Sequence, residues 1–169
     1  MLQLHCTQKV REQFGIHADP LAESKTSNAA LGNWYVNLLT IDRRKTLIFM
    51  SERTLLSFLL FGVKKKSGVV LAELFVNGLV QLLEMEDFTG PEIHRAIGAG
   101  DELRYSKTRN RKALGNLNDL QQLYALAILD EGGFSHCNLW EIMRRMNRMP
   151  QKNIGWAFSI ELARDAIAA

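Results

Sequence analysis

Along residues 2–7, apolar and polar side chains alternate with the period of a half-buried β-strand. Two further runs, Trp34–Ile41 and Lys45–Glu52, are rich in β-branched and aromatic residues, and the polar Asp42-Arg43-Arg44 between them predicts a β-hairpin. Both faces of each run carry apolar side chains, so we expect these strands to be central in a sheet. The run Leu55–Val63 predicts a further antiparallel strand.

Apolar residues recur at helical spacing through most of the remaining chain. Val70–Leu83 predicts one helix, and Thr89-Gly90-Pro91-Glu92 has the cap, proline and glutamate that begin another. The tetrapeptide Asn118-Asp119-Leu120-Gln121 predicts that a third helix begins there and continues to about Glu131. We also expect a short helix between Thr7 and Gly15, a mobile loop over Asp19–Leu31, a short strand over Leu103–Ser106, and helices over Asn138–Met149 and from Ser159 to the end.

These elements predict an α+β fold, with an antiparallel sheet centred on the hairpin and covered by helices mainly from the C-terminal half. The 169 residues contain no internal repeat, low-complexity tract or linker, so we expect a single domain over residues 1–169. Hydrophobic residues make up 47% of the chain and charged residues 23%, a balance that excludes wholesale disorder and a fibrous repeat.

The chain has neither the cysteines of a disulfide framework nor an apolar segment long enough to cross a bilayer. Its two cysteines are Cys6 and Cys137, and the longest apolar stretch is broken by Ser57 and Gly62. The N-terminus lacks the apolar run of a signal peptide. We therefore expect a cytoplasmic protein that does not enter the membrane.

A basic tract precedes the third predicted helix. It has five cations in nine residues and no acid between Leu103 and Leu117: Arg104, Lys107, Arg109, Arg111 and Lys112. Guanidinium groups at this density suit phosphate recognition, and a helix start beside them favours an anion. The alternative is a solvated loop that offsets nearby acids, because Lys and Arg total 21 against 18 Asp and Glu, a net charge of only +3.

A second polar cluster lies on the hairpin. Asn33, Tyr35 and Asn37 have the same parity and share one face of the predicted sheet, and Ser51-Glu52-Arg53 follows where the next strand ends. Polar groups on a face that is otherwise apolar need partners, and such partners often form a binding site. Alternatively, Asn37 and Glu52 serve a structural network with loop backbone and Arg53.

No motif in the sequence predicts a metal, a cofactor or a nucleophile. His5-Cys6 and His136-Cys137 carry suitable zinc ligands, but His5 and Cys6 would point to opposite faces of their strand, and the chain has no C-x-x-C or H-x-x-x-H pair. We therefore expect ordinary core cysteines. The chain contains no nucleophile elbow, phosphate-binding loop or dinucleotide fingerprint. We expect no cofactor.

The predicted helix Asn138–Met149 carries a stripe of apolar side chains in which methionine is prominent, with arginines off the stripe. Such a stripe can be an adaptable surface for a protein partner. It can equally be ordinary core with a basic outer face.

Three stretches of the sequence resemble an uncharacterised bacterial family, the domain-of-unknown-function family numbered 6933. They are Leu2–Thr7, then Gly32–Leu39 with Ser51–Leu56, and then Lys107–Arg111 with Leu114–Asp119. The resemblance implies a small single-domain protein and no established catalytic residue. It marks the same two polar clusters, and so implies that they meet in space.

We therefore expect a non-catalytic binding module for a phosphate-containing ligand or nucleic acid. Arg53, Lys107, Arg109 and Arg111 would hold phosphate, and Asn37, Asn118 and Asp119 would orient the ligand or these cations. Two alternatives stay open: an enzyme on a nucleotide or another phosphate-containing substrate, with Glu52 or Asp119 as general base, and an antitoxin-like or defence-associated factor that binds protein through Asn138–Met149.

Overall fold

The computed structural model describes residues 2–17, 27–64, 68–98 and 102–169. The main sheet has five strands: β1 Leu2–Cys6, β2 Trp34–Ile41, β3 Arg44–Ser51, β4 Ser57–Phe61 and β5 Leu103–Lys107. The helices are α1 Gln8–Phe14, α2 Gly68–Met85, α3 Gly90–Ile97, α4 Arg111–Asp130, α5 Leu139–Met146 and α6 Ser159–Ala168. A small second sheet pairs β6 Pro150–Gln151 with β7 Ala157–Phe158 around the 3-10 helix η2 Lys152–Ile154. Of the predicted loop Asp19–Leu31, residues 19–26 lie outside the described part of the chain.

The main sheet is mixed, so the prediction of a purely antiparallel sheet is wrong. Its strand order is β4-β3-β2-β1-β5, and β1 is parallel to both β2 and β5. Strands β2, β3 and β4 are antiparallel to one another, as predicted. Local sequence patterns do not predict the parallel pairs. Each partner of β1 follows it in the same direction only after a long intervening segment that includes a helix.

The predicted hairpin is confirmed as the middle of the sheet. Strand β2 is central, β3 is its neighbour, and the two pair in register from Trp34 opposite Ser51 to Ile41 opposite Arg44. The turn residues Asp42 and Arg43 both have left-handed backbones, with φ of 49° and 63°. Two successive left-handed residues give the turn whose twist suits a two-residue hairpin.

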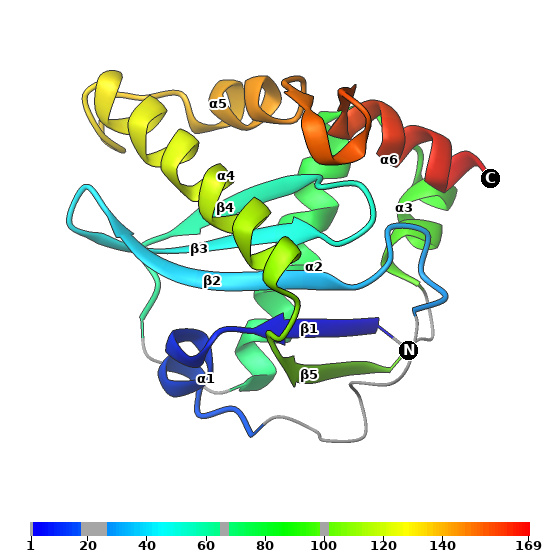
Figure 1. Cartoon of the computed structure of the whole chain (residues 1–169), viewed down its shortest axis with the longest axis horizontal. Helices are drawn as coiled ribbons and strands as arrows, with labels where there is room; N and C mark the ends of the chain where they lie inside the picture. The colour runs from blue at the N-terminus through cyan, green and yellow to red at the C-terminus, as the bar shows by residue number, and fades with distance from the viewer. Residues whose placement is uncertain (1, 18–26, 65–67, 99–101) are drawn as a thin grey trace.

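Helices cover both faces of the main sheet, with α4 crossing in front of it and α2 lying behind it in Figure 1. On the α2 side, Trp34 and Phe58 pack against Phe75 in an aromatic cluster. Gly78 of α2 lies directly over Phe58, because a Cβ added at this glycine would be 2.5 Å from the ring. Helices from the second half of the chain, α4 among them, cover the other face. Helix α2 begins at residue 68, in the first half, so both halves of the chain supply helices that cover the sheet.

The α4 face is fixed by buried polar groups around Ser57. The hydroxyls of Ser57 and Tyr124 lie 2.8 Å apart. Asn147, just after α5, accepts a hydrogen bond from the Ser57 N–H and donates one to the Ser57 carbonyl oxygen, both at 2.9 Å. Asn147 is completely buried, so these bonds join α5 to the edge strand β4 in a place that water does not reach.

Helix α4 begins eight residues earlier than predicted, with Asn110 and not Asn118 as its N-cap. The Asn110 side chain accepts a hydrogen bond from the Ala113 N–H at the start of the helix. The buried residues of α4 follow at helical spacing: Ala113, Leu117, Leu120, Tyr124 and Ile128. Asn118 and Asp119 therefore lie within the helix and not at its start. The capping box predicted at Thr89 and Glu92 is confirmed.

The two cysteines should differ in their reaction with thiol reagents at pH 8. Burial raises the pKa of Cys6 to about 12, and the pKa of the partly exposed Cys137 is also raised, by burial and by the neighbouring Glu131. Only the thiolate reacts, so Cys6 should stay unlabelled in the native protein and Cys137 should react slowly, at a rate that increases with pH. Mass spectrometry should find one label on the native chain and two in denaturant. Prompt labelling of Cys6 in the native protein would contradict its burial.

Candidate functional site

The polar residues of the hairpin take two different roles. The Asn33 side chain accepts a hydrogen bond from the Gln3 N–H at 3.0 Å and ties β1 to the chain entering β2, which is structural. Tyr35 is buried and stacks on His5, with ring centroids 4.6 Å apart. Burial and the nearby Glu52 raise the pKa of Tyr35 to about 12. Tyr35 is thus neutral at physiological pH.

Asn37 connects the hairpin to α4. Its Oδ1 accepts a hydrogen bond from the Thr7 hydroxyl at 2.7 Å, and its Nδ2 donates to the Gln121 side chain. Gln121 in turn donates to Asn118 Oδ1 at 3.4 Å, so Asn37 and Asn118 belong to one polar chain. Sequence analysis missed Gln121 as the connecting residue. The signal was its position three residues after Asn118, on the same helix face.

Glu52 and Arg53 open onto a small pocket of about 170 Å³ at the start of α4. Its other polar walls are Asn110, Lys112 and Asn116 from α4 and its cap, together with Asn153 from η2. The Asn153 side chain donates a hydrogen bond to Asn116 and closes one side. Three segments that are distant in sequence thus meet at this pocket.

Arg53 is held in place by the loop that precedes β2. Its Nη1 donates to the Ala30 carbonyl oxygen at 2.9 Å, and its side chain lies over Gly32, whose φ is +73°. Ser51 beside it donates to the Leu31 carbonyl oxygen at 2.8 Å. The structural alternative therefore accounts for part of this cluster: Arg53 and Ser51 anchor the loop that precedes β2.

The cations of the basic tract are not all equivalent. Arg104 forms an ion pair with Glu102 at 2.9 Å, which offsets its charge. Lys107, Arg109, Arg111 and Lys112 are exposed, and within the described part of the chain Lys107, Arg111 and Lys112 form no ion pair. Lys112 lines the pocket, whereas Lys107, Arg109, Arg111 and Asp119 do not.

The His-Cys dipeptides do not converge. His5 Nδ1 lies 2.6 Å from the Ser106 hydroxyl, on the face of the sheet opposite to Cys6. Among the residues that the structure describes, no three His, Cys, Asp or Glu side chains lie together as metal ligands would.

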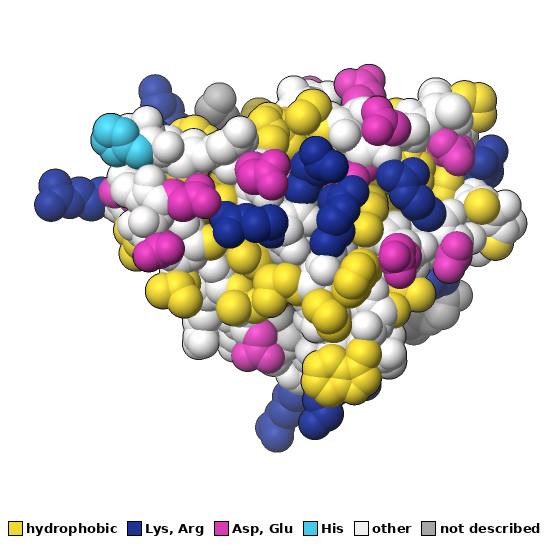
Figure 2. Space-filling view, turned by 90° about the horizontal axis from the view of Figure 1, so that it is seen from above, with side chains coloured by type: hydrophobic (Ala, Val, Ile, Leu, Met, Phe, Trp, Pro, Cys, Tyr) yellow, Lys and Arg dark blue, Asp and Glu magenta, His cyan; other side chains and the backbone are white. Residues whose placement is uncertain are grey.

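Helix α5 uses most of its apolar stripe in the core. Ile142, Met143 and Met146 are buried, as the structural alternative holds. Two arginines beside the stripe pair with acids: Arg145 with Glu131 at 2.8 Å, and Arg148 with the buried Glu86 at 2.5 and 2.9 Å. Figure 2 shows the face that carries α5, where basic side chains gather at the centre with acidic and apolar ones around them. This face is mixed in charge.

The fold and its polar clusters define an α+β protein with a mixed sheet, in which the hairpin and the start of α4 share a pocket. Within the described ranges, no helix has both the length and the hydropathy needed to cross a membrane. The chain belongs to the family described as Domain of unknown function (DUF6933), whose model matches residues 3–162. No curated protein matches the chain.

Proposed function

We propose that the protein is a non-catalytic binding module for a phosphate-containing ligand, with nucleic acid as the favoured class. The observation that carries this proposal is the pocket of about 170 Å³, where Arg53 and Lys112 lie among the amides of Asn110, Asn116 and Asn153. Fixed amide donors beside two cations are the groups that hold phosphate oxygens. A pocket of this size takes one phosphate group and leaves the rest of the ligand on the surface.

The surroundings of the pocket extend the site for a longer anion. Lys107, Arg109 and Arg111 lie within five residues of Lys112 in the sequence and are exposed on the chain leading into α4. The positive end of this 20-residue helix adds to their field. Glu52 opposes an anion in the pocket, so affinity rests on the cations outnumbering it.

Trp156 favours a nucleic acid over a simple phosphate. It is 64% exposed on the same loop that contributes Asn153 to the pocket. An exposed indole is a platform on which a base can stack, and stacking of this kind tolerates any sequence.

The enzyme alternative has one supporting observation. Glu52 is an exposed carboxylate that lines the pocket beside Arg53 and Lys112, where it could take a proton from a bound substrate. Asp119 lies outside the pocket lining, so Glu52 is the better candidate for general base. In that case Glu52→Gln would abolish turnover while the ligand still bound.

Binding of a fluorescein-labelled single-stranded oligonucleotide, followed by anisotropy, tests the proposal. With about three phosphate contacts, log K against log salt should have a slope of about −2 to −3. Lys112→Ala and Arg111→Ala should each weaken binding and flatten the slope by up to about one unit. Trp156→Ala should weaken binding without changing the slope, and Glu52→Ala should leave it intact or strengthen it.

Arg144→Ala is the matched control, since Arg144 is an exposed arginine on α5, away from the pocket lining. This variant should bind as the wild type does. Equal effects of Arg144→Ala and Arg111→Ala would show diffuse attraction without a site. Lack of salt-sensitive binding to DNA, RNA or nucleotides at low ionic strength would overturn the proposal.

A further inference from the structure

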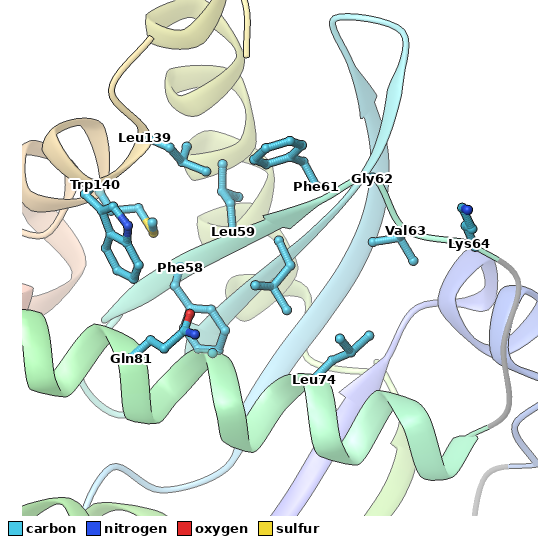
Figure 3. Close-up of a pocket in the computed structure, with 13 residues that line it drawn as sticks. Phe58, Leu59, Phe61, Gly62, Val63, Lys64, Leu74, Gln81, Leu139 and Trp140 are labelled. Carbon is cyan, nitrogen blue, oxygen red and sulfur yellow. The ribbon is translucent and has the colours of Figure 1, made fainter. Parts of the chain in front are cut away.

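A second and larger cavity, of about 510 Å³, lies between β4, α2 and α5. One wall is formed by residues 58–64, one by the side of α2 that carries Leu74 and Gln81, and one by Leu139, Trp140 and Met143 of α5. Figure 3 shows these three walls. A pocket of this size can bury most of a small molecule, and it shares no lining residue with the phosphate pocket.

The floor of the cavity is close-packed. Phe58 and Leu59 are only 1% and 2% exposed, and a Cβ added at Gly78 would be 2.5 Å from the Phe58 ring. The empty space therefore lies above this floor, between the side chains of the walls. The fold forms the cavity without any rearrangement of its core.

The backbone of β4 cannot hold an occupant here. Asn147 takes both outward backbone groups of Ser57, and the next outward residue, Leu59, is almost fully buried. Of the outward residues of this strand, Phe61 at its end is the one that is open. An occupant must be held by side chains, and this favours a small molecule over an extended peptide.

The upper walls leave apolar surface in contact with solvent. Phe61 is 42% exposed, although its ring stacks on Phe134 with centroids 4.4 Å apart. Leu139 and Trp140 are half-buried. Covering these side chains would remove apolar surface from water, which is favourable in proportion to the area. A ligand should therefore be apolar along most of its length.

The polar groups of the cavity lie at its two ends. Figure 3 shows Lys64 at one end, with Gln81 and Trp140 at the other. Within the described ranges Lys64 forms no ion pair, and none of the described lining residues is acidic. The Arg44 guanidinium, 5.5 Å from the centroid of the Phe61 ring, adds positive charge beside the cavity. An anionic group is thus favoured at the Lys64 end.

We propose that this cavity binds a small amphipathic carboxylic acid, with its carboxylate at Lys64 and its apolar body directed past Phe61 toward Leu139 and Trp140. The wall from Phe58 to Phe61 alone spans about 10 Å, at about 3.3 Å per residue, so it can accompany an alkyl chain of about eight carbon atoms. Such a ligand would contact β4, α2 and α5 at once. Its binding should therefore stabilise the native protein.

Titration of the full chain with dodecanoate, below its micellar concentration, tests the proposal. Calorimetry should find one site per chain, and the midpoint of thermal unfolding should rise with the concentration of dodecanoate, because the ligand binds the folded state. Dodecanol, which has the same chain without the charge, should bind more weakly. Absence of binding, or a midpoint that falls as it would in a detergent, would overturn the proposal.

Brominated acids report the orientation of the ligand, because bromine quenches the fluorescence of a tryptophan that it touches. The ω-bromo acid carries bromine at its apolar end and should quench Trp140, whereas α-bromododecanoate carries it beside the carboxylate and should quench much less. Trp140→Phe should remove the quenching, since Trp34 is fully buried and Trp156 lies outside the cavity lining. Stronger quenching by the α-bromo acid would overturn the assignment of the carboxylate to Lys64.

Lys64→Met and Lys9→Met form a matched pair, because both remove the charge of an exposed lysine and only Lys64 lines the cavity. Lys64→Met should weaken dodecanoate binding about three- to fivefold, as expected for a charge pair at an exposed site, and should leave dodecanol binding unchanged. Lys9→Met should bind both ligands as the wild type does. Equal affinity of dodecanoate for Lys64→Met and the wild type would exclude recognition of the carboxylate by Lys64.

Leu139→Trp tests the cavity itself, because the larger side chain would fill part of the space. It should abolish the binding of dodecanoate and of dodecanol alike. If this variant is unstable, the bromine and Lys64→Met measurements still decide the question, since neither depends on it. A dimer in sedimentation that Leu139→Trp abolishes, with no binding of dodecanoate, would make a second copy of the chain the occupant and overturn the proposal.

Discussion

Replacing Asn147 with alanine should lower the free energy of unfolding by about 2 to 6 kcal/mol, because it leaves two buried backbone groups of Ser57 without partners at about 1–3 kcal/mol each. The Asn147 side chain is completely buried, so water cannot take its place without opening the contact between α5 and β4. Urea denaturation of the wild type and the variant, with an unchanged m-value, measures the difference.

Asn77→Ala is the control, because Asn77 is exposed on α2 and makes no side-chain hydrogen bond within the described residues. It should change stability by no more than about 0.5 kcal/mol. Asn147→Asp separates the two bonds: only the protonated acid can donate to the Ser57 carbonyl oxygen. The stability of that variant relative to the wild type should therefore increase as the pH falls from 7 toward 4. A loss below about 1 kcal/mol for Asn147→Ala would contradict the role assigned to these bonds.

Arg148→Met should lower the free energy of unfolding by about 2 to 4 kcal/mol. The Arg148 guanidinium donates to both carboxylate oxygens of Glu86, whose side chain is only 2% exposed, and methionine would leave that carboxylate buried without its cation. Arg164 cannot replace it in this geometry, because its guanidinium donates to the Glu86 backbone oxygen and lies over the Phe88 ring. The expected loss is below the upper end for buried pairs because Arg148 itself is 35% exposed.

The double variant Glu86→Gln with Arg148→Met should recover at least half of that loss, because a neutral amide is less costly to bury than a carboxylate. Arg145→Met provides the comparison: its partner Glu131 is 37% exposed, and breaking such a surface pair should cost no more than about 1 kcal/mol. Equal losses for Arg145→Met and Arg148→Met would show that burial of Glu86 contributes nothing.

Local patterns predicted the hairpin and the helix capped at Thr89, but not the direction of β1. Two polar residues between two apolar runs are a signal that acts over a few residues, and so is a capping box. The pairing of β1 with β5 joins residues 2–6 to residues 103–107, and its direction depends on the path of everything between them. Nothing in the alternation of Leu2–Cys6 encodes that path, so the sheet was predicted to be antiparallel.

The candidate site was predicted only in part, and the reason is similar. The chemistry of Arg53, Lys112 and the asparagines could be identified from residue types, but their meeting depends on where α4 begins. Asn110 and Asn118 both resemble helix caps, and the buried Ala113 is too small to mark the first turn as apolar. The outward backbone of β4 could not be predicted at all, because edge position is a property of the assembled sheet.

The position of β1 between β2 and β5 sets the order in which the chain can fold. As the chain is synthesised, strands β2 to β4 can pair as soon as they emerge, since short turns join them. Strand β5 begins at residue 103, which is 101 residues after the start of β1 at residue 2. Closing so long a loop costs entropy before any contact offsets it, so the β1–β5 ladder should complete last and limit the rate. Until then, β1 can pair with β2 on one side only and its other edge stays open to other chains, and this is the interval in which the nascent protein is most exposed to aggregation.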